Sequence, residues 1–213
     1  MSAHTILVCN ITPGRETEAR SVLRDYSAFL EGHGAQETIY RNLFAGEQSG
    51  RLLVYAAAES TAARAAFLDK VLADGSNNPY QKAIASSDPP ISGWGRTMVR
   101  TLDPGIPMLP QSRLRIVRVM SAPFGRRAEV QDAFAGARRR LEGLGVTAAG
   151  YLIETGVASN DPFAWSLAVD SMAAWEDFER RNAALTPAGP LATALTGGLL
   201  TPVGRRVDIR FDV

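Results

Sequence analysis

Two arginines late in the first half of the chain have the spacing that most suggests chemistry. Arg96 and Arg100 are four residues apart in a segment expected to be a strand, so their side chains share one face. A guanidinium on such a face can hold a carboxylate or an enolate through paired hydrogen bonds. In the alternative interpretation, both arginines lie at a sheet rim and extend into water.

A polar residue ends the first apolar run of the chain. Asn10 directly precedes a Thr-Pro-Gly turn signal, and its amide could donate to a bound oxyanion. The alternative is that Asn10 only serves the turn. Asn10, Arg96 and Arg100 form the predicted catalytic set.

Three aromatic residues are predicted to line a ligand pocket. Trp165 shares a strand face with apolar neighbours, Tyr40 lies in another expected strand, and Trp94 is expected in a loop before the last strand of the first half. Aromatic side chains at such positions also serve as core or as loop anchors, and this alternative stays open.

Composition excludes several classes of protein. Cys9 is the only cysteine and His4 and His33 are the only histidines, so a disulfide framework or a multi-cysteine zinc site is excluded. We expect no metal and no cofactor. The 23 basic and 22 acidic residues argue against a general nucleic-acid binder, which would carry a basic excess. The apolar runs are too short to span a membrane, so a cytoplasmic protein without nucleic-acid or membrane partners is expected.

An internal repeat organises these residues. The run Leu30-Glu31-Gly32-His33-Gly34 returns as Leu141-Glu142-Gly143-Leu144-Gly145, 111 residues later. Turn and helix-cap signals align at the same offset. The sequence therefore predicts two copies, residues 1–102 and 113–213, joined by a proline-rich linker at 103–112.

Each copy has the pattern of a β-α-β-β-α-β unit. Strands are expected at 5–10, 35–44, 51–58, 96–102, 113–120, 146–155, 163–169 and 207–213. Helices are expected from near Pro13 to a stop at Gly32 and Gly34, and at 61–72, 126–143 and 172–181. The predicted fold class is α+β, with two tandem ferredoxin-like (βαββαβ) repeats packed sheet to sheet as an intrachain α+β barrel.

Several segments resemble a known family. Residues 13–16, 50–60 and 161–175 are similar to the antibiotic-biosynthesis-monooxygenase superfamily of dimeric α+β barrel proteins. The resemblance implies a cofactor-independent oxygenase, in which an ionisable substrate loses a proton and its carbanion reacts with O₂. This chain has Ala58 and Val169 where typical members have tryptophan. It also lacks the histidine that a haem-degrading branch carries on its second helix.

Two functions follow as expectations. The first is a cofactor-independent monooxygenase-like enzyme acting on a small apolar, ionisable, aromatic compound. The alternative is a non-catalytic α+β barrel that binds a small ligand or a protein partner. A homodimer is expected in either case, because twofold pairs are the commonest soluble oligomers.

The two copies differ in one way that predicts where a site lies. At positions expected to share a sheet face, the first copy is small or polar and the second is mostly bulky and apolar. The sets are Asn10, Ala56, Ala58, Arg96 and Arg100 against Ser121, Leu167, Val169, Val207 and Phe211. We therefore expect one binding site, in the first copy. Arg140 replaces Phe29 at the repeat offset and is a candidate for an interface or a pocket edge.

Overall fold

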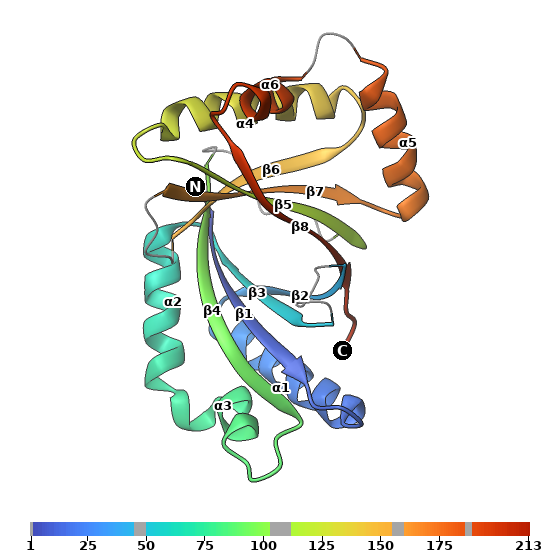
Figure 1. Cartoon of the computed structure of the whole chain (residues 1–213). Helices are drawn as coiled ribbons and strands as arrows, with labels where there is room; N and C mark the ends of the chain where they lie inside the picture. Colours follow the sequence, from blue (N-terminus) through green and yellow to red (C-terminus); the bar gives the residue numbers. More distant parts are fainter. Residues whose placement is uncertain (1, 45–49, 103–111, 155–159, 186–188) are drawn as a thin grey trace.

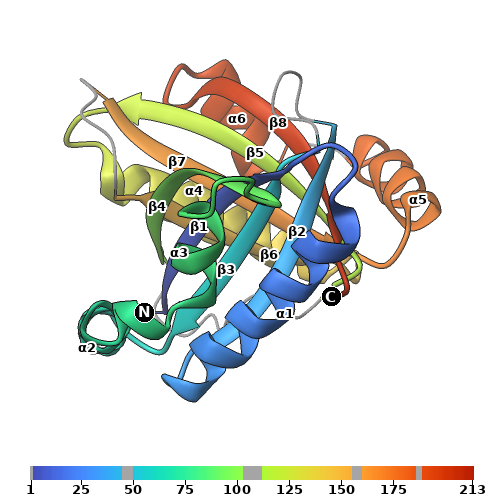
Figure 2. The ribbon, with the colours of Figure 1, turned by 90° about the horizontal axis from the view of Figure 1, so that it is seen from below.

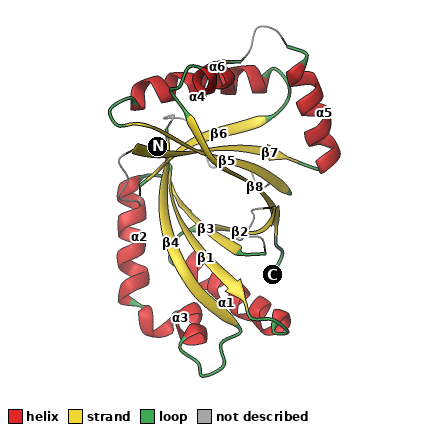
Figure 3. Ribbon diagram, in the orientation of Figure 1, coloured by secondary structure: helices red, strands yellow, loops and turns green. Residues whose placement is uncertain are grey.

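Eight antiparallel strands close into one barrel with helices on its outside (Figures 1 and 3). The computed structural model describes residues 2–44, 50–102, 112–154, 160–185 and 189–213. The elements are β1 (Ala3–Ile11), α1 (Glu16–Gly32), β2 (Gln36–Phe44), β3 (Leu52–Ala58), α2 (Thr61–Ala73), a short 3₁₀ turn (Gly75–Asn77), α3 (Pro79–Ile84), β4 (Ile91–Thr101), β5 (Leu114–Pro123), α4 (Arg127–Glu142), β6 (Thr147–Ile153), β7 (Asn160–Val169), α5 (Met172–Ala183), α6 (Pro190–Thr196) and β8 (Thr201–Arg210). The mixed α+β class and the closed barrel agree with the sequence-based expectation.

The strands of the two halves follow the same order. The barrel order β1-β3-β2-β8-β5-β7-β6-β4 contains β4-β1-β3-β2 from the first half and β8-β5-β7-β6 from the second. Leu7 lies opposite Val54 in the first half, and Arg118 lies opposite Trp165 in the second. These pairs are 111 residues apart, so the offset read from the sequence describes the first three strands of each half.

The offset changes in the last strand of each half. Leu7 pairs with Arg96 in β4, whereas Arg118 pairs with Arg205 in β8, so these strands correspond at an offset of 109. Arg96 therefore matches Arg205, and Arg100 matches Ile209. The equivalence with Val207 and Phe211 was wrong, because the segments before the two strands differ by two residues in length.

Two hydrogen-bonded seams join the halves. At the β2–β8 seam, four residues of β2 pair with β8, and at the β4–β6 seam three residues of β4 pair with β6. The halves thus form one continuous closed sheet. The expected intrachain barrel is therefore closed by strand pairing at both seams.

Local sequence signals explain the helix starts. Ser60 and Ser171 precede α2 and α5, and each side-chain oxygen accepts a hydrogen bond at 3.1 Å, from the amides of Ala63 and Ala174 respectively. Such caps satisfy amides that have no partner within the helix. The sequence predicted both caps correctly.

Several elements differ from expectation. β4 begins at Ile91 and not at residue 96, so Trp94 lies in a strand and not in a loop. α6 (Pro190–Thr196) was not predicted, and β8 runs from Thr201 to Arg210 and not over residues 207–213. The expected linker lies almost wholly at 103–111, outside the described residues. No helix in the described part of the chain is long and apolar enough to cross a membrane.

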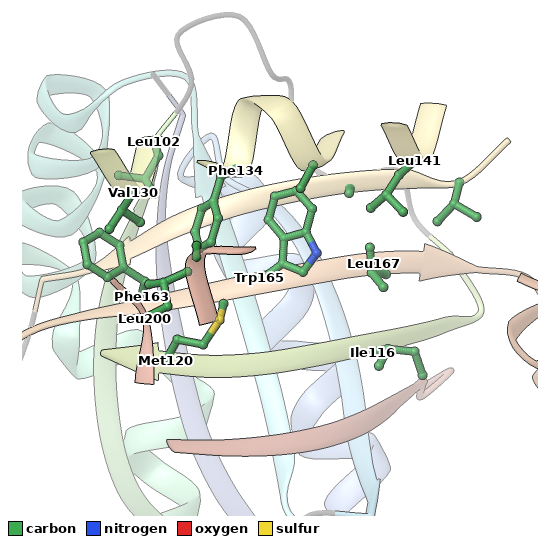
Figure 4. Close-up of a cluster of buried hydrophobic side chains, with 14 of the residues drawn as sticks. Leu102, Ile116, Met120, Val130, Phe134, Leu141, Phe163, Trp165, Leu167 and Leu200 are labelled. Carbon is green, nitrogen blue, oxygen red and sulfur yellow. The ribbon is translucent and has the colours of Figure 1, made fainter. Parts of the chain in front are cut away.

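The apolar core divides into an outer layer for each half and a smaller cluster within the barrel. In the first half, α1 lies across β2 on the outer face (Figure 2). In the second half, Phe134 of α4 and Trp165 of β7 lie side by side over the sheet (Figure 4). Gly150 faces Phe134 so closely that a Cβ there would collide with the ring. Ile6, Leu53 and Val99 belong to the inner cluster.

Candidate functional site

A cavity of about 300 Å³ lies in the second half, between the outer face of β5 and β7 and the helices α4, α5 and α6. It is lined by Arg118, Ala137, Arg140, Leu141, Trp165, Leu167, Phe178, Glu179, Asn182, Ala183, Gly189, Pro190, Leu191, Ala192 and Leu195. This size and a mainly apolar lining with a few polar groups are typical of small-molecule sites.

The base of the cavity is apolar and well packed. Trp165 is 2% exposed, and its ring centroid lies 4.9 Å from that of Phe134. Leu167 of the same strand and Phe178 of α5 are also buried. A flat apolar ligand could therefore pack here without moving the wall.

Two arginines and one carboxylate gather at one side of the cavity: Arg118 and Glu179 line it, and the half-exposed Arg205 lies next to Glu179. Glu179 Oε1 lies 3.7 Å from Arg118 Nη2 and 3.8 Å from Arg205 Nη2, so one carboxylate is shared by two guanidinium groups. Burial lowers the pKa of Arg118, the positive charge of Arg205 lowers it further, and Glu179 opposes both effects. A second anion near Arg118 would relieve this imbalance.

Arg140 shapes the opposite wall. Its Nε donates to Asn182 Oδ1 at 3.3 Å, and its Nη2 donates to the carbonyl oxygen of Leu185 at 3.1 Å. Gly189 allows a close approach, because a Cβ there would lie 3.1 Å from Arg140 Cδ. Arg140 therefore positions the end of α5 and the start of α6, as its unusual place in the repeat suggested.

The corresponding place in the first half is almost filled. A cavity of only about 10 Å³ lies there, lined by Tyr26, Val54 and Ala56 among others. At the offset of 111, polar or small residues of the second half replace apolar ones: Arg118 replaces Leu7, Ala137 replaces Tyr26, Arg140 replaces Phe29, Glu179 replaces Leu68, and Asn182 replaces Val71.

This arrangement corrects the expected location of the larger cavity. The volume left by Ala56 is taken by Tyr26 of α1, whose ring lies 5.3 Å from that of Tyr80 in α3. The sequence-based prediction did not include Arg118, Glu179 or Asn182, although the repeat offset of 111 marks all three. Arg118 lies in β5 and the other two lie in α5, and each replaces an apolar residue of the first half.

The predicted catalytic residues do not converge. Asn10 pairs with Ser92 near one end of β1, whereas Arg100 pairs with Ala3 at the other end. Arg100 Nε lies 3.3 Å from Glu154 Oε1, and Glu154 Oε2 lies 2.6 Å from Arg64 Nη2. Arg100 thus forms an ion pair beside the β4–β6 seam.

The remaining predicted residues occupy different places. Arg96 lines the small first-half cavity. Tyr40 lies inside the barrel, and its hydroxyl donates to the carbonyl oxygen of Ser112 at 3.2 Å. The side chain of Trp94 lies outside what the structure describes. Trp165 lines the 300 Å³ cavity.

The lone cysteine lies on the outer face of β1 in the first half. Cys9 is fully buried, and burial raises the pKa of its thiol to about 12. A thiol of this kind is not a nucleophile at neutral pH.

Comparison with known proteins bears on the fold. No protein-family model matches the chain, and no curated protein matches it. Several solved structures are similar to the chain. A putative monooxygenase from Lactobacillus acidophilus matches with a TM-score of 0.59 and 9% identity, over 100% of this chain and 94% of that one. A haem-binding protein from Thermus thermophilus matches with a TM-score of 0.56 and 11% identity, over 99% and 91%. A putative chlorite dismutase matches with a TM-score of 0.55 and 14% identity, over 99% and 95%.

The chain has the α+β barrel fold of these proteins. Because the sequence identities are so low, the similarity to these solved structures establishes the fold and nothing about function. What this α+β barrel does must be argued from its own residues.

The haem-binding neighbour raises the question of whether the cavity suits haem. Haem iron takes an axial ligand from histidine, cysteine, methionine or tyrosine. None of the residues lining the cavity is of these types, and both histidines of the sequence lie in the first half. The residues therefore do not fit an axially ligated haem. Within the described ranges, no group of three or more His, Cys, Asp or Glu side chains could hold a metal ion.

Proposed function

We propose that this α+β barrel binds a small, flat, mainly apolar compound carrying one negative charge, in the cavity of its second half. The apolar part packs against Trp165 and Phe178, and the anionic group meets Arg118. The observation that carries the proposal is the shared carboxylate of Glu179, which leaves the Arg118–Arg205 pair with one uncompensated positive charge beside an apolar cavity.

The proposal includes the origin of the site. We regard residues 1–102 and 113–213 as tandem ferredoxin-like copies, in which the first keeps a packed core and the second has opened it. Because one chain closes the barrel, a homodimer would form through outer surfaces and would leave this cavity within a single chain.

Arg118→Met is expected to weaken binding of 1-naphthoate by about 10- to 100-fold, since a hydrogen bond to a charged group contributes about 1.5–3 kcal/mol. Isothermal titration calorimetry measures the change. The neutral amide 1-naphthamide, which lacks the charge, should bind both proteins alike.

Arg96→Met is the matched control, because it removes one arginine from beside the first-half cavity. It should leave naphthoate binding unchanged. Equal loss in both arginine variants, or unaltered binding by Arg118→Met, would contradict the proposed site.

A second candidate function is oxygenation without a cofactor, and the position of Glu179 favours it. Glu179 is a carboxylate that lines a mainly apolar cavity, where it could accept a proton from a carbon acid. A CH₂ group that loses this proton gives a carbanion, which takes up O₂ and regains the proton as a hydroperoxide. Loss of water from the hydroperoxide leaves a ketone.

Glu179→Gln tests this reaction with anthrone, an acidic CH₂ compound. If the chain oxygenates it, O₂ uptake measured with an oxygen electrode should fall by about 100-fold or more, as expected for loss of a general base. Glu176→Gln, on an exposed position of the same helix, should keep full activity. If the rate of O₂ uptake is the same with and without the protein, the oxygenase proposal is wrong and ligand binding remains the proposed function of the cavity.

A further inference from the structure

Charged side chains lie inside the barrel, far from any role in the outer cavity. Arg115 of β5 and Asp208 of β8 are directly opposite each other in the sheet. They are 6% and 0% exposed. Arg206 lies two residues before Asp208 and shares its face. Ionised groups in a barrel interior are costly unless they have partners.

Arg206 and Asp208 compensate each other. Arg206 Nε lies 3.1 Å from Asp208 Oδ2, and Arg206 Nη2 donates to the Tyr55 hydroxyl at 2.9 Å. Burial raises the pKa of Asp208, and the charges of Arg206 and, to a smaller extent, Arg115 lower it. One carboxylate therefore faces two inward-pointing arginines.

Arg115 has a weaker set of partners. Its Nε donates to Ser166 Oγ at 3.4 Å, and its guanidinium lies 4.9 Å and 4.6 Å from the rings of Tyr40 and Tyr55. Among the residues that the structure describes, no carboxylate forms an ion pair with it. Cation–π contacts recover part of the cost of burial but do not neutralise the charge.

The neighbouring histidine adds no further positive charge at neutral pH. His4 lines the same space, where burial and the nearby Arg115 and Arg64 lower its pKa to about 4. It is therefore neutral at pH 7. The inward-facing set around Arg115 keeps one excess positive charge.

A cavity of about 30 Å³ lies beside Arg115, and no carboxylate lines it. Its lining is His4, Ile6, Tyr55, Val99, Arg115, Val117, Tyr151, Ala164, Ser166 and Arg206. The hydroxyls of Tyr55 and Ser166 each accept from an arginine, so each keeps its own proton for donation. The volume equals that of about two to three water-sized particles, which occupy about 10–15 Å³ each on this measure.

We propose that the barrel interior binds one small monovalent anion of halide size, with chloride as the expected occupant and Arg115 as its main ligand. The site combines an uncompensated buried cation, hydroxyl donors and a volume too small for a polyatomic anion such as sulfate. The bound anion neutralises the positive charge of Arg115, with which no carboxylate of the described residues forms an ion pair.

Bromide is the direct probe, because its anomalous scattering identifies it in a crystal. In crystals of the full chain grown with sodium bromide, an anomalous peak is expected inside the barrel within hydrogen-bond reach of Arg115. Crystals that show bromide only on the outer surface, or not at all, overturn the proposal.

A stability titration gives an independent test. Bromide replaces gluconate at constant ionic strength, and unfolding is followed in urea. At bromide concentrations well above half-saturation, each tenfold rise in bromide should raise the folded-to-unfolded ratio about tenfold. Arg115→Met should abolish this dependence, whereas Arg24→Met, which removes an exposed arginine, should keep it.

A bromide dependence that is equal in all three proteins, or absent from the unaltered chain, contradicts the internal site. If Arg115→Met does not fold, the anomalous map of the unaltered chain decides the question by itself.

Discussion

Trp165→Ala is expected to lower the free energy of unfolding by about 3–5 kcal/mol, the usual cost of truncating a large buried aromatic residue. Trp165 is 2% exposed and packs on Phe134, so the surrounding side chains have little freedom to fill the space. Urea unfolding followed by circular dichroism measures the change.

Phe124→Ala is the matched control. Phe124 is also aromatic and belongs to the same half, but it is 79% exposed. Its truncation should change stability by no more than about 0.5 kcal/mol. A loss of less than about 1 kcal/mol for Trp165→Ala would show that α4 and α6 close onto β7 when the indole is removed.

Acid should destabilise the protein through His4. The unfolded chain binds a proton at His4 near pH 6.5, whereas the folded chain does so only near pH 4. The contribution of neutral His4 to stability is therefore complete above about pH 6.5 and is lost as the pH falls toward 4. Between about pH 7.5 and 4.5 the loss amounts to roughly 2–3 kcal/mol.

The contribution of His4 to the pH dependence of stability is isolated by comparing the unaltered chain with the variants His4→Gln and His33→Gln. The free energy of unfolding of the unaltered chain should fall by roughly 2–3 kcal/mol more between these pH values than that of His4→Gln. His33→Gln, which removes the other histidine, should resemble the unaltered chain. The same pH dependence in His4→Gln would assign the acid sensitivity to other groups.

Short-range signals explain why much of the fold could be predicted. Ser60 and Ser171 cap helices through contacts three residues away, and such signals do not depend on distant parts of the chain. Alternating apolar residues fix the strand faces in the same local way. The closed barrel followed because each half presents a sheet face that needs cover.

The candidate site could not be placed from strand patterns, since its volume is set by helices. Ala56 leaves room on β3, yet Tyr26 of α1 lines that space, and its ring packs against Tyr80 of α3. The position of α3 depends on a turn at Gly75–Asn77 that has no periodic signature. Likewise, the shift of two residues in the last strand comes from segment length, which the apolar pattern of the strand does not record.

The two seams have a consequence for how the molecule opens. Ten residues of β5 pair with β7, whereas only three residues of β4 pair with β6. Sub-global unfolding starts where few backbone hydrogen bonds must break. We therefore expect the barrel to part first along the β4–β6 seam. Such a transient opening gives solvent a route to the enclosed side chains of the barrel while both outer cores stay intact.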